Sequence, residues 1–257
     1  MKMKIFDSHA HYDDDSFNED RIRVLEELKN NNIIGVLNCG SSFKGAVDSL
    51  NLAKNNDFFY AAVGIHPEYA DTVDEDMLNE IKNMTSHPKV KAIGEIGLDY
   101  YYEDNPPKEV QKEAFIKQMK LAKELNLPVV IHDRDAHKDI LDIIKMFPEV
   151  HGVIHCFSGS VEFARECLKL GYYIGFTGIV TFKNARKTLE VVKEVPIDKI
   201  LVETDCPYMA PEPHRGKRNR SEYIEQIIKK VAKIKEISEE ELNNQVILNT
   251  KHLLNIK

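Results

Sequence analysis

Two histidines separated by one residue follow the first apolar run of the chain, in the segment Asp7-Ser8-His9-Ala10-His11. Alternate side chains of an extended segment point to the same side, so the two imidazoles lie about 6.6 Å apart along it. That spacing suits the binding of one metal ion. Histidines of the core or the surface are the alternative interpretation of a single such pair.

Other apolar runs also end on groups that bind metals. Glu95, His132, His155 and Asp205 each follow a different run. A polar group at such a position is costly to bury unless it has a partner. Imidazole and carboxylate suit Zn, Mn, Ni, Co or Mg, and six ligands are too many for one tetrahedral ion. We therefore expect two divalent ions bridged by a carboxylate, with the ligands His9, His11, Glu95, His132, His155 and Asp205.

Eight short runs rich in β-branched residues position these groups, and helical patterns lie between them. The runs span residues 4–8, 33–38, 58–64, 90–94, 129–132, 152–155, 172–176 and 199–204. Two further helices follow, and Ser238 and Glu241 form a capping box at the start of the second. The alternation predicts an α/β fold, a (β/α)8 barrel with an additional C-terminal helix, as one domain over residues 1–257. Such barrels carry their chemistry where the strands end.

Composition excludes several classes of protein. The 257 residues are 42% hydrophobic and 30% charged, which excludes collagen, coiled coil and disorder. No apolar run is long enough to cross a membrane, and we expect a cytoplasmic protein with reduced cysteines. The sequence contains no glycine-rich phosphate-binding loop, so we expect no nucleotide cofactor. The net charge of -7 argues against broad contact with duplex DNA, although residues 214–220 are strongly basic.

Several segments resemble TatD-type metal-dependent deoxyribonucleases. The matching motifs are residues 7–11, 64–67, 94–100, 155–159, 203–208 and 213–219. The resemblance implies a TIM-type barrel of the metallo-dependent hydrolase superfamily that cleaves phosphodiester bonds in DNA. Carried over by position, it implies the same six metal ligands. Many distant relatives bridge their ions with a carbamylated lysine, but here Lys89 and Lys91 stand at the start of the fourth strand, so we expect Glu95 to bridge.

Two acidic residues near the end of the eighth strand are assigned different roles. We expect Asp205 to orient the attacking water and to accept its proton. Glu203 lies two residues earlier, on the same face and one layer deeper. Either it orients the ligands or shares a proton, or it is a structural carboxylate.

Substrate contacts are predicted for His66, Arg134, His214 and Arg215. His66 contacts a phosphate or caps a turn, and Arg134 grips a phosphate oxygen or pairs with a neighbouring aspartate such as Asp99. In the tyrosine run at 100–102 one ring could stack on a base, whereas packing explains the others.

The prediction is therefore an exodeoxyribonuclease that prefers single strands or chain ends. A small-molecule ester or amide hydrolase with the same dinuclear centre is one alternative, and an inactive metal-binding scaffold is another.

Overall fold

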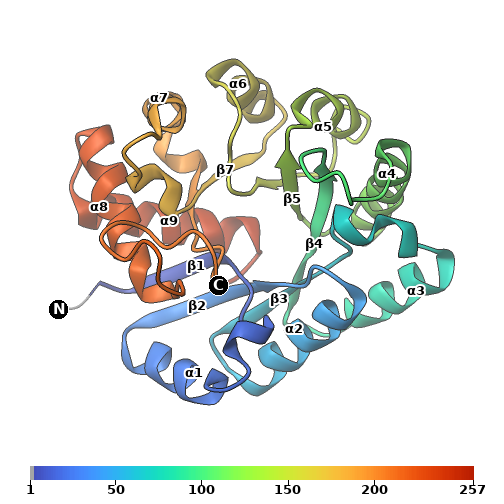
Figure 1. Cartoon of the computed structure of the whole chain (residues 1–257), viewed down its shortest axis with the longest axis horizontal. Helices are drawn as coiled ribbons and strands as arrows, with labels where there is room; N and C mark the ends of the chain where they lie inside the picture. Colours follow the sequence, from blue (N-terminus) through green and yellow to red (C-terminus); the bar gives the residue numbers. More distant parts are fainter. Residues whose placement is uncertain (1–2) are drawn as a thin grey trace.

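The computed structural model describes residues 3–257 and contains an eight-stranded parallel sheet in the order of the chain, β1 to β8. Figure 1 shows the strands at the centre with helices around them, the arrangement of a (β/α)8 barrel. The predicted fold class is confirmed. The strands are β1 (Ile5–Ala10), β2 (Ile33–Cys39), β3 (Phe59–Val63), β4 (Val90–Asp99), β5 (Val129–Arg134), β6 (Gly152–Ile154), β7 (Tyr173–Phe176) and β8 (Ile200–Val202).

Helices separate the strands and bury their apolar faces on the outside of the sheet. Two more follow β8, as predicted, and Ser238 accepts a hydrogen bond from the Glu241 backbone N–H at 3.0 Å at the start of the last one. The helices are α1 (Arg21–Asn30), α2 (Phe43–Asn55), α3 (Glu75–Met84), α4 (Lys108–Leu125), α5 (His137–Ile144), α6 (Val161–Lys169), α7 (Arg186–Glu194), α8 (Ile224–Lys235) and α9 (Glu239–Leu253). Within residues 3–257, no helix combines the length and apolar character needed to cross a membrane.

The interior of the barrel is packed at one end. Apolar side chains from the strands, such as Phe6, Leu37 and Val130, form a separate core there. Leu253 and Leu254, at the end of α9, belong to the same core and close this end. Polar side chains are therefore left to the opposite end, where the strands terminate.

The barrel closes between β8 and β1 just beyond the end of β8. Ala10 and Cys206 form an isolated parallel bridge. The Asp205 backbone N–H donates to the His9 carbonyl at 3.0 Å, and the His11 N–H donates to the Cys206 carbonyl at 2.8 Å. Closure thus brings two predicted ligand segments from the two ends of the chain together.

The fourth strand is longer than predicted. The sequence places its end at Gly94, whereas β4 continues to Asp99. The extra residues pair with β5, where Gly97 lies opposite His132 and Asp99 lies opposite Arg134. This pairing depends on β5, a distant segment of the chain. The apolar pattern of residues 90–94 alone therefore cannot predict where β4 ends.

Candidate metal centre

Four predicted ligands meet at the end of the barrel where the strands terminate. His9 and His11 point to the same side, as predicted, and their Nε2 atoms are 3.0 Å apart. Glu95 Oε2 lies 3.4 Å from His9 Nε2 and 3.5 Å from His11 Nε2. Asp205 Oδ1 lies 3.7 Å and 3.3 Å from the same two nitrogens. Three strand ends that are distant in sequence therefore supply one compact group.

A second group surrounds the other oxygen of Glu95. Its Oε1 lies 2.9 Å from His132 Nδ1 and 3.0 Å from His155 Nε2. The Nε2 atom of His66 is 3.8 Å from the same oxygen. Glu95 thus presents one oxygen to each group, which is the arrangement of a bridging carboxylate.

The donor set fits divalent ions. Four ligands at about 2.1 Å from one ion, tetrahedrally arranged, lie about 3.4 Å from one another. The His9 and His11 nitrogens are 3.0 Å apart, and each lies 3.3 to 3.7 Å from an oxygen of Glu95 and an oxygen of Asp205. Imidazole nitrogens with carboxylate oxygens suit Zn and the neighbouring first-row metals. The first group therefore has the spacing and the chemistry of a metal site.

Electrostatics at the centre favour positive charge. Burial alone would raise the pKa of Glu95, but the charges of His155 and His9 hold that pKa well below its usual range. Burial would likewise raise the pKa of Asp205, but the hydrogen bond from His11 lowers it. In His11, burial is outweighed by the hydrogen bond to Asp205 and by the charge of Glu95, so its pKa rises to about 9. Both carboxylates are thus ionised and attract cations.

A local irregularity of β4 aims Glu95 into the centre. The register with β5 shifts between Ile93 and Ile96. Such a shift redirects a side chain that regular alternation would place elsewhere. Two residues further on, Gly97 has a φ of +144°, and a Cβ there would lie 2.0 Å from the His132 carbonyl oxygen. The close approach of β4 and β5 beside the centre therefore requires glycine.

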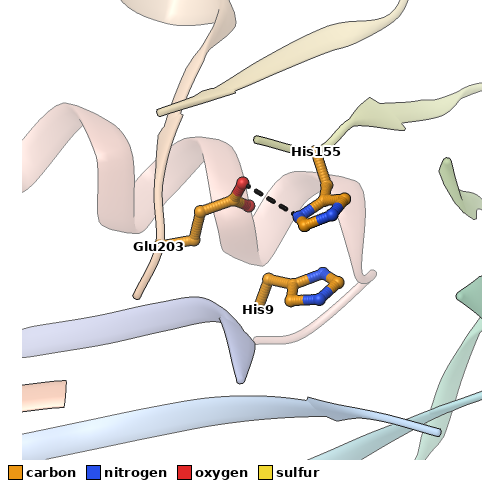
Figure 2. Close-up of side chains that lie close together, drawn as sticks. All are labelled: His9, His155 and Glu203. Carbon is orange, nitrogen blue, oxygen red and sulfur yellow. Dashed lines mark ion pairs between the residues drawn. The ribbon is translucent and has the colours of Figure 1, made fainter. Parts of the chain in front are cut away.

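The carboxylate of Glu203 lies beside the rings of His9 and His155 and forms an ion pair with His155, as Figure 2 shows. Its Oε1 is 3.4 Å from His155 Nδ1 and accepts the Cys156 backbone N–H at 2.6 Å. The residue is fully buried, and the two rings stack with centroids 3.9 Å apart. Of the two roles weighed for Glu203, these contacts favour orientation of the ligand His155.

The space for Glu203 depends on Gly175 of β7. A Cβ at this position would lie 2.6 Å from Glu203 Oε1. Any larger residue would displace the carboxylate from the two rings. The sequence gives no sign of this requirement, because the two residues lie on different strands.

Asp7 is a functional candidate that the sequence analysis missed. Its Oδ2 accepts hydrogen bonds from Thr204 Oγ1 at 2.6 Å and Ser221 Oγ at 2.7 Å. Burial raises its pKa to about 7. The contacts join β1 to the segment that carries Asp205, whose backbone adopts a φ of +56°. The sequence signal for Asp7 was an acidic residue within an apolar run, because a buried carboxylate requires partners.

His66 shows features of both predicted roles. Its Nδ1 accepts the Glu68 backbone N–H at 3.2 Å, which caps the turn after β3. Its other nitrogen faces Glu95, and the ring lies 4.3 Å from that of His132. Burial, followed by the charge of His132, lowers the pKa of His66 to about 3. A neutral ring therefore borders the second group.

Arg134 does not form the predicted alternative pair with an aspartate. Asp99 Oδ2 instead contacts His132 Nε2 at 3.1 Å. The Arg134 guanidinium lies over the rings of Tyr101 and Tyr102, at 4.1 and 4.9 Å from their centroids. No carboxylate in residues 3–257 forms an ion pair with Arg134. Its charge is thus available to an external anion.

Only part of the basic segment 214–220 is free to contact a substrate. Arg218 pairs with Asp20, and Arg220 pairs with both Glu27 and Glu222. These ion pairs therefore connect the segment to α1 and its N-cap and to Glu222, which follows the segment.

The remaining predicted contacts of this segment have aromatic partners. Arg215 lies 4.3 Å from the centroid of Phe182, and His214 stacks on Tyr223 at 3.9 Å. In the described part of the chain, neither Arg215 nor Lys217 forms an ion pair. The two cations can therefore still neutralise a phosphate.

The cysteines have no nucleophilic character here. All four are free, and Cys206 is buried in the core. Burial raises the pKa of Cys156, which follows His155, to about 12. His137 is engaged locally, because its Nδ1 lies 2.8 Å from Asp133 Oδ2. The chemistry of this end of the barrel therefore belongs to its imidazoles and carboxylates.

Comparison with known proteins identifies relatives over the full length of the chain. Residues 6–255 match the family described as TatD related DNase. The uncharacterized metal-dependent hydrolase YabD of Bacillus subtilis (strain 168) is 43% identical over 254 residues, with 98% of this chain and 99% of YabD covered. The uncharacterized metal-dependent hydrolase YcfH of Escherichia coli (strain K12) is 35% identical, with coverage of 99% and 97%.

A solved structure agrees in fold. The crystal structure of YJJV, a TatD homolog from Escherichia coli, has a TM-score of 0.92 and 30% identity, with 100% of both chains covered. The chain therefore belongs to the TatD-related DNase family of metal-dependent hydrolases.

Proposed function

We propose that the protein hydrolyses phosphodiester bonds in DNA, with two divalent ions as cofactors and with single strands or chain ends as preferred substrates. The observation that carries the proposal is the position of Glu95, whose two oxygens face two separate groups of imidazoles. The family match supports DNA as the substrate. We further propose that residues 1–257 act as a single domain.

His9, His11, Glu95 and Asp205 would hold one ion, and Glu95, His132 and His155 would hold the other. When bound, the ions supply charge neutralisation at the phosphate and make a water molecule easier to deprotonate.

The proton acceptor is assigned to Asp205. Its side chain is 13% exposed, whereas that of Glu203 is fully buried. A base must reach the proton that it accepts, directly or through one water. Asp205 is ionised and borders the open side of the centre, so it orients the water and takes its proton. Glu203 acts through the rings of His9 and His155.

Phosphate binding is assigned to groups around the open end of the barrel. Within residues 3–257, Arg134 and Arg215 have no carboxylate partner, and His66 borders the second ligand group. His214 belongs to the same loop as Arg215. Four groups are few compared with a duplex-coating surface, which favours a single strand or a chain end.

Metal removal and restoration test the proposal directly. Chelator treatment of the full chain is expected to abolish hydrolysis of a labelled single-stranded oligonucleotide, because the ions are required for charge neutralisation. Addition of Mg, Mn or Zn should restore it, with two ions per chain by elemental analysis. Duplex DNA should be cleaved more slowly. Full activity with trace metal would contradict the dinuclear centre, and turnover of small esters without loss of DNA would assign the alternative substrate class.

The loop of residues 214–220 provides a second test. Arg215→Ala and Lys217→Ala are each expected to weaken binding of a single-stranded oligonucleotide without changing metal content. Each lost phosphate contact should flatten the dependence of log affinity on log salt by about 0.7. Lys229→Ala on α8 is the matched control, because it removes a cation outside the loop. Salt slopes equal to that of the parent in both loop variants would contradict the assignment.

A further inference from the structure

Two exposed tyrosines lie beside the metal centre. Tyr101 is 55% exposed and Tyr102 is 53% exposed, although both are large aromatic residues. They follow β4 directly, at the end of the barrel where Glu95 and His132 meet. Two adjacent exposed aromatic rings beside a candidate metal centre form a candidate binding surface.

The backbone that carries Tyr101 is anchored beside the candidate centre. The Tyr101 backbone N–H donates to Asp99 Oδ1 at 2.9 Å, and the other oxygen of Asp99 contacts His132. Gln111 holds the same aspartate through its backbone N–H and carbonyl, each at 2.9 Å. Asp99 therefore links the position of Tyr101 to that of a candidate metal ligand.

Arg134 completes the arrangement. Its guanidinium lies over both rings and donates to the Tyr102 hydroxyl at 3.3 Å. The rings themselves are nearly perpendicular, at 86°, with centroids 4.9 Å apart. Tyr101, Tyr102 and Arg134 thus form one unit, which we call the tyrosine–arginine platform. It offers exposed aromatic rings for a base and, among the residues that the structure describes, a cation with no carboxylate partner for a phosphate.

We propose that the tyrosine–arginine platform binds a nucleotide of a single strand beside the scissile bond, with a base stacked on Tyr101 and a phosphate at Arg134. This proposal rests on the proposed DNA-hydrolysing function and specifies its substrate contacts. Base stacking on aromatic rings tolerates any sequence, and it requires an unpaired base. A base within a duplex is already stacked on its neighbours. The platform therefore favours binding of single-stranded over duplex DNA.

Tyr101 is the assigned stacking ring because it stays 55% exposed although Arg134 lies over one face, and because Asp99 holds its backbone. The base is assigned to the ring face that Arg134 does not cover. Tyr100 differs from both. Its hydroxyl donates to Asp139 at 2.8 Å, and Lys108 lies over its ring at 4.2 Å. Tyr100 is therefore engaged in packing.

A single tryptophan can report on the platform, because the chain contains none. In the metal-loaded Tyr101→Trp variant, a phosphorothioate oligothymidylate, which resists hydrolysis, is expected to quench the fluorescence in a saturable way. An oligonucleotide of the same length with abasic residues should quench weakly. Leu248→Trp is the control, since Leu248 is 59% exposed on α9, whose end closes the opposite end of the barrel. Equal quenching by the abasic strand would overturn base stacking.

Affinity measurements separate the platform from the proposed function. Tyr101→Leu is expected to weaken oligothymidylate binding by about tenfold or more, whereas Tyr101→Phe should retain most of the affinity. Melting temperatures establish that both variants are folded. If DNA is hydrolysed but Tyr101→Leu binds like the parent, the platform is wrong and the function stands. Base-dependent quenching without hydrolysis by any metal supports the platform and overturns the function.

Discussion

Replacing Glu95 by glutamine is expected to lower kcat for DNA hydrolysis by at least about 10³-fold and to reduce the number of ions bound per chain. Glutamine has nearly the same size, but it offers one acceptor oxygen where glutamate offers two. Each oxygen of Glu95 faces a different pair of imidazoles, at 3.4 and 3.5 Å on one side and 2.9 and 3.0 Å on the other. The amide therefore cannot serve both groups. Elemental analysis and single-turnover kinetics measure the two effects.

Glu68→Gln is the matched control for this variant. Glu68 is exposed on the turn after β3, at the same end of the barrel, and its side chain contacts no candidate ligand. Metal content and kcat should equal those of the parent. A Glu95→Gln protein that keeps two ions and parental kcat would contradict the bridging role.

Asp205→Asn is expected to reduce kcat by about 10² or more while the melting temperature stays close to that of the parent. Asparagine preserves the size of the side chain and one acceptor oxygen for His11, but it cannot accept the proton of the water. The nearby His9 carbonyl still accepts the backbone N–H of residue 205, so the turn is retained. Steady-state kinetics with saturating metal, together with thermal unfolding, check the prediction.

The comparison with Glu203→Gln separates a proton acceptor from a positioning residue. Glu203 accepts a hydrogen bond from the Cys156 backbone N–H and contacts Nδ1 of His155. Its replacement should therefore lower metal affinity, and added metal should recover part of the activity. Asp205→Asn also loses a ligand charge, so added metal should restore its metal content but not its kcat. Parental kcat in Asp205→Asn combined with a metal-independent loss in Glu203→Gln would assign the base to Glu203.

The predicted strands agree with the structure because their apolar patterns are local. Residues 33–38 differ from β2 by one residue at one end, and residues 58–64 differ from β3 by one residue at each end. The β4 boundary differs by five residues, since Gly97 and Asp99 extend the strand only by pairing with β5. The apolar pattern thus predicts that a strand exists, whereas its end depends on a partner.

The candidate ligands could be predicted because polar groups at the ends of buried strands are costly and must converge in a barrel. The ion-pair partners of the charged loop residues could not be predicted. Arg218 and Asp20 are 198 residues apart in the chain, and Arg220 and Glu27 are 193 residues apart. Their pairing divides one basic segment into structural cations and free cations, and no feature of the segment itself makes that distinction.

The sequence by itself determined the alternation of strands and helices, the identity of the six candidate ligands and the family, because periodicity, residue type and motif order are properties of the linear chain. Three features were decided only by the tertiary structure. They are the register shift of β4 at Glu95, the position of Glu203 beside two imidazoles and the stacking of Arg134 on tyrosines. Each of these features is a contact between different segments of the chain. Such contacts depend on side-chain packing in three dimensions, which local sequence patterns do not specify.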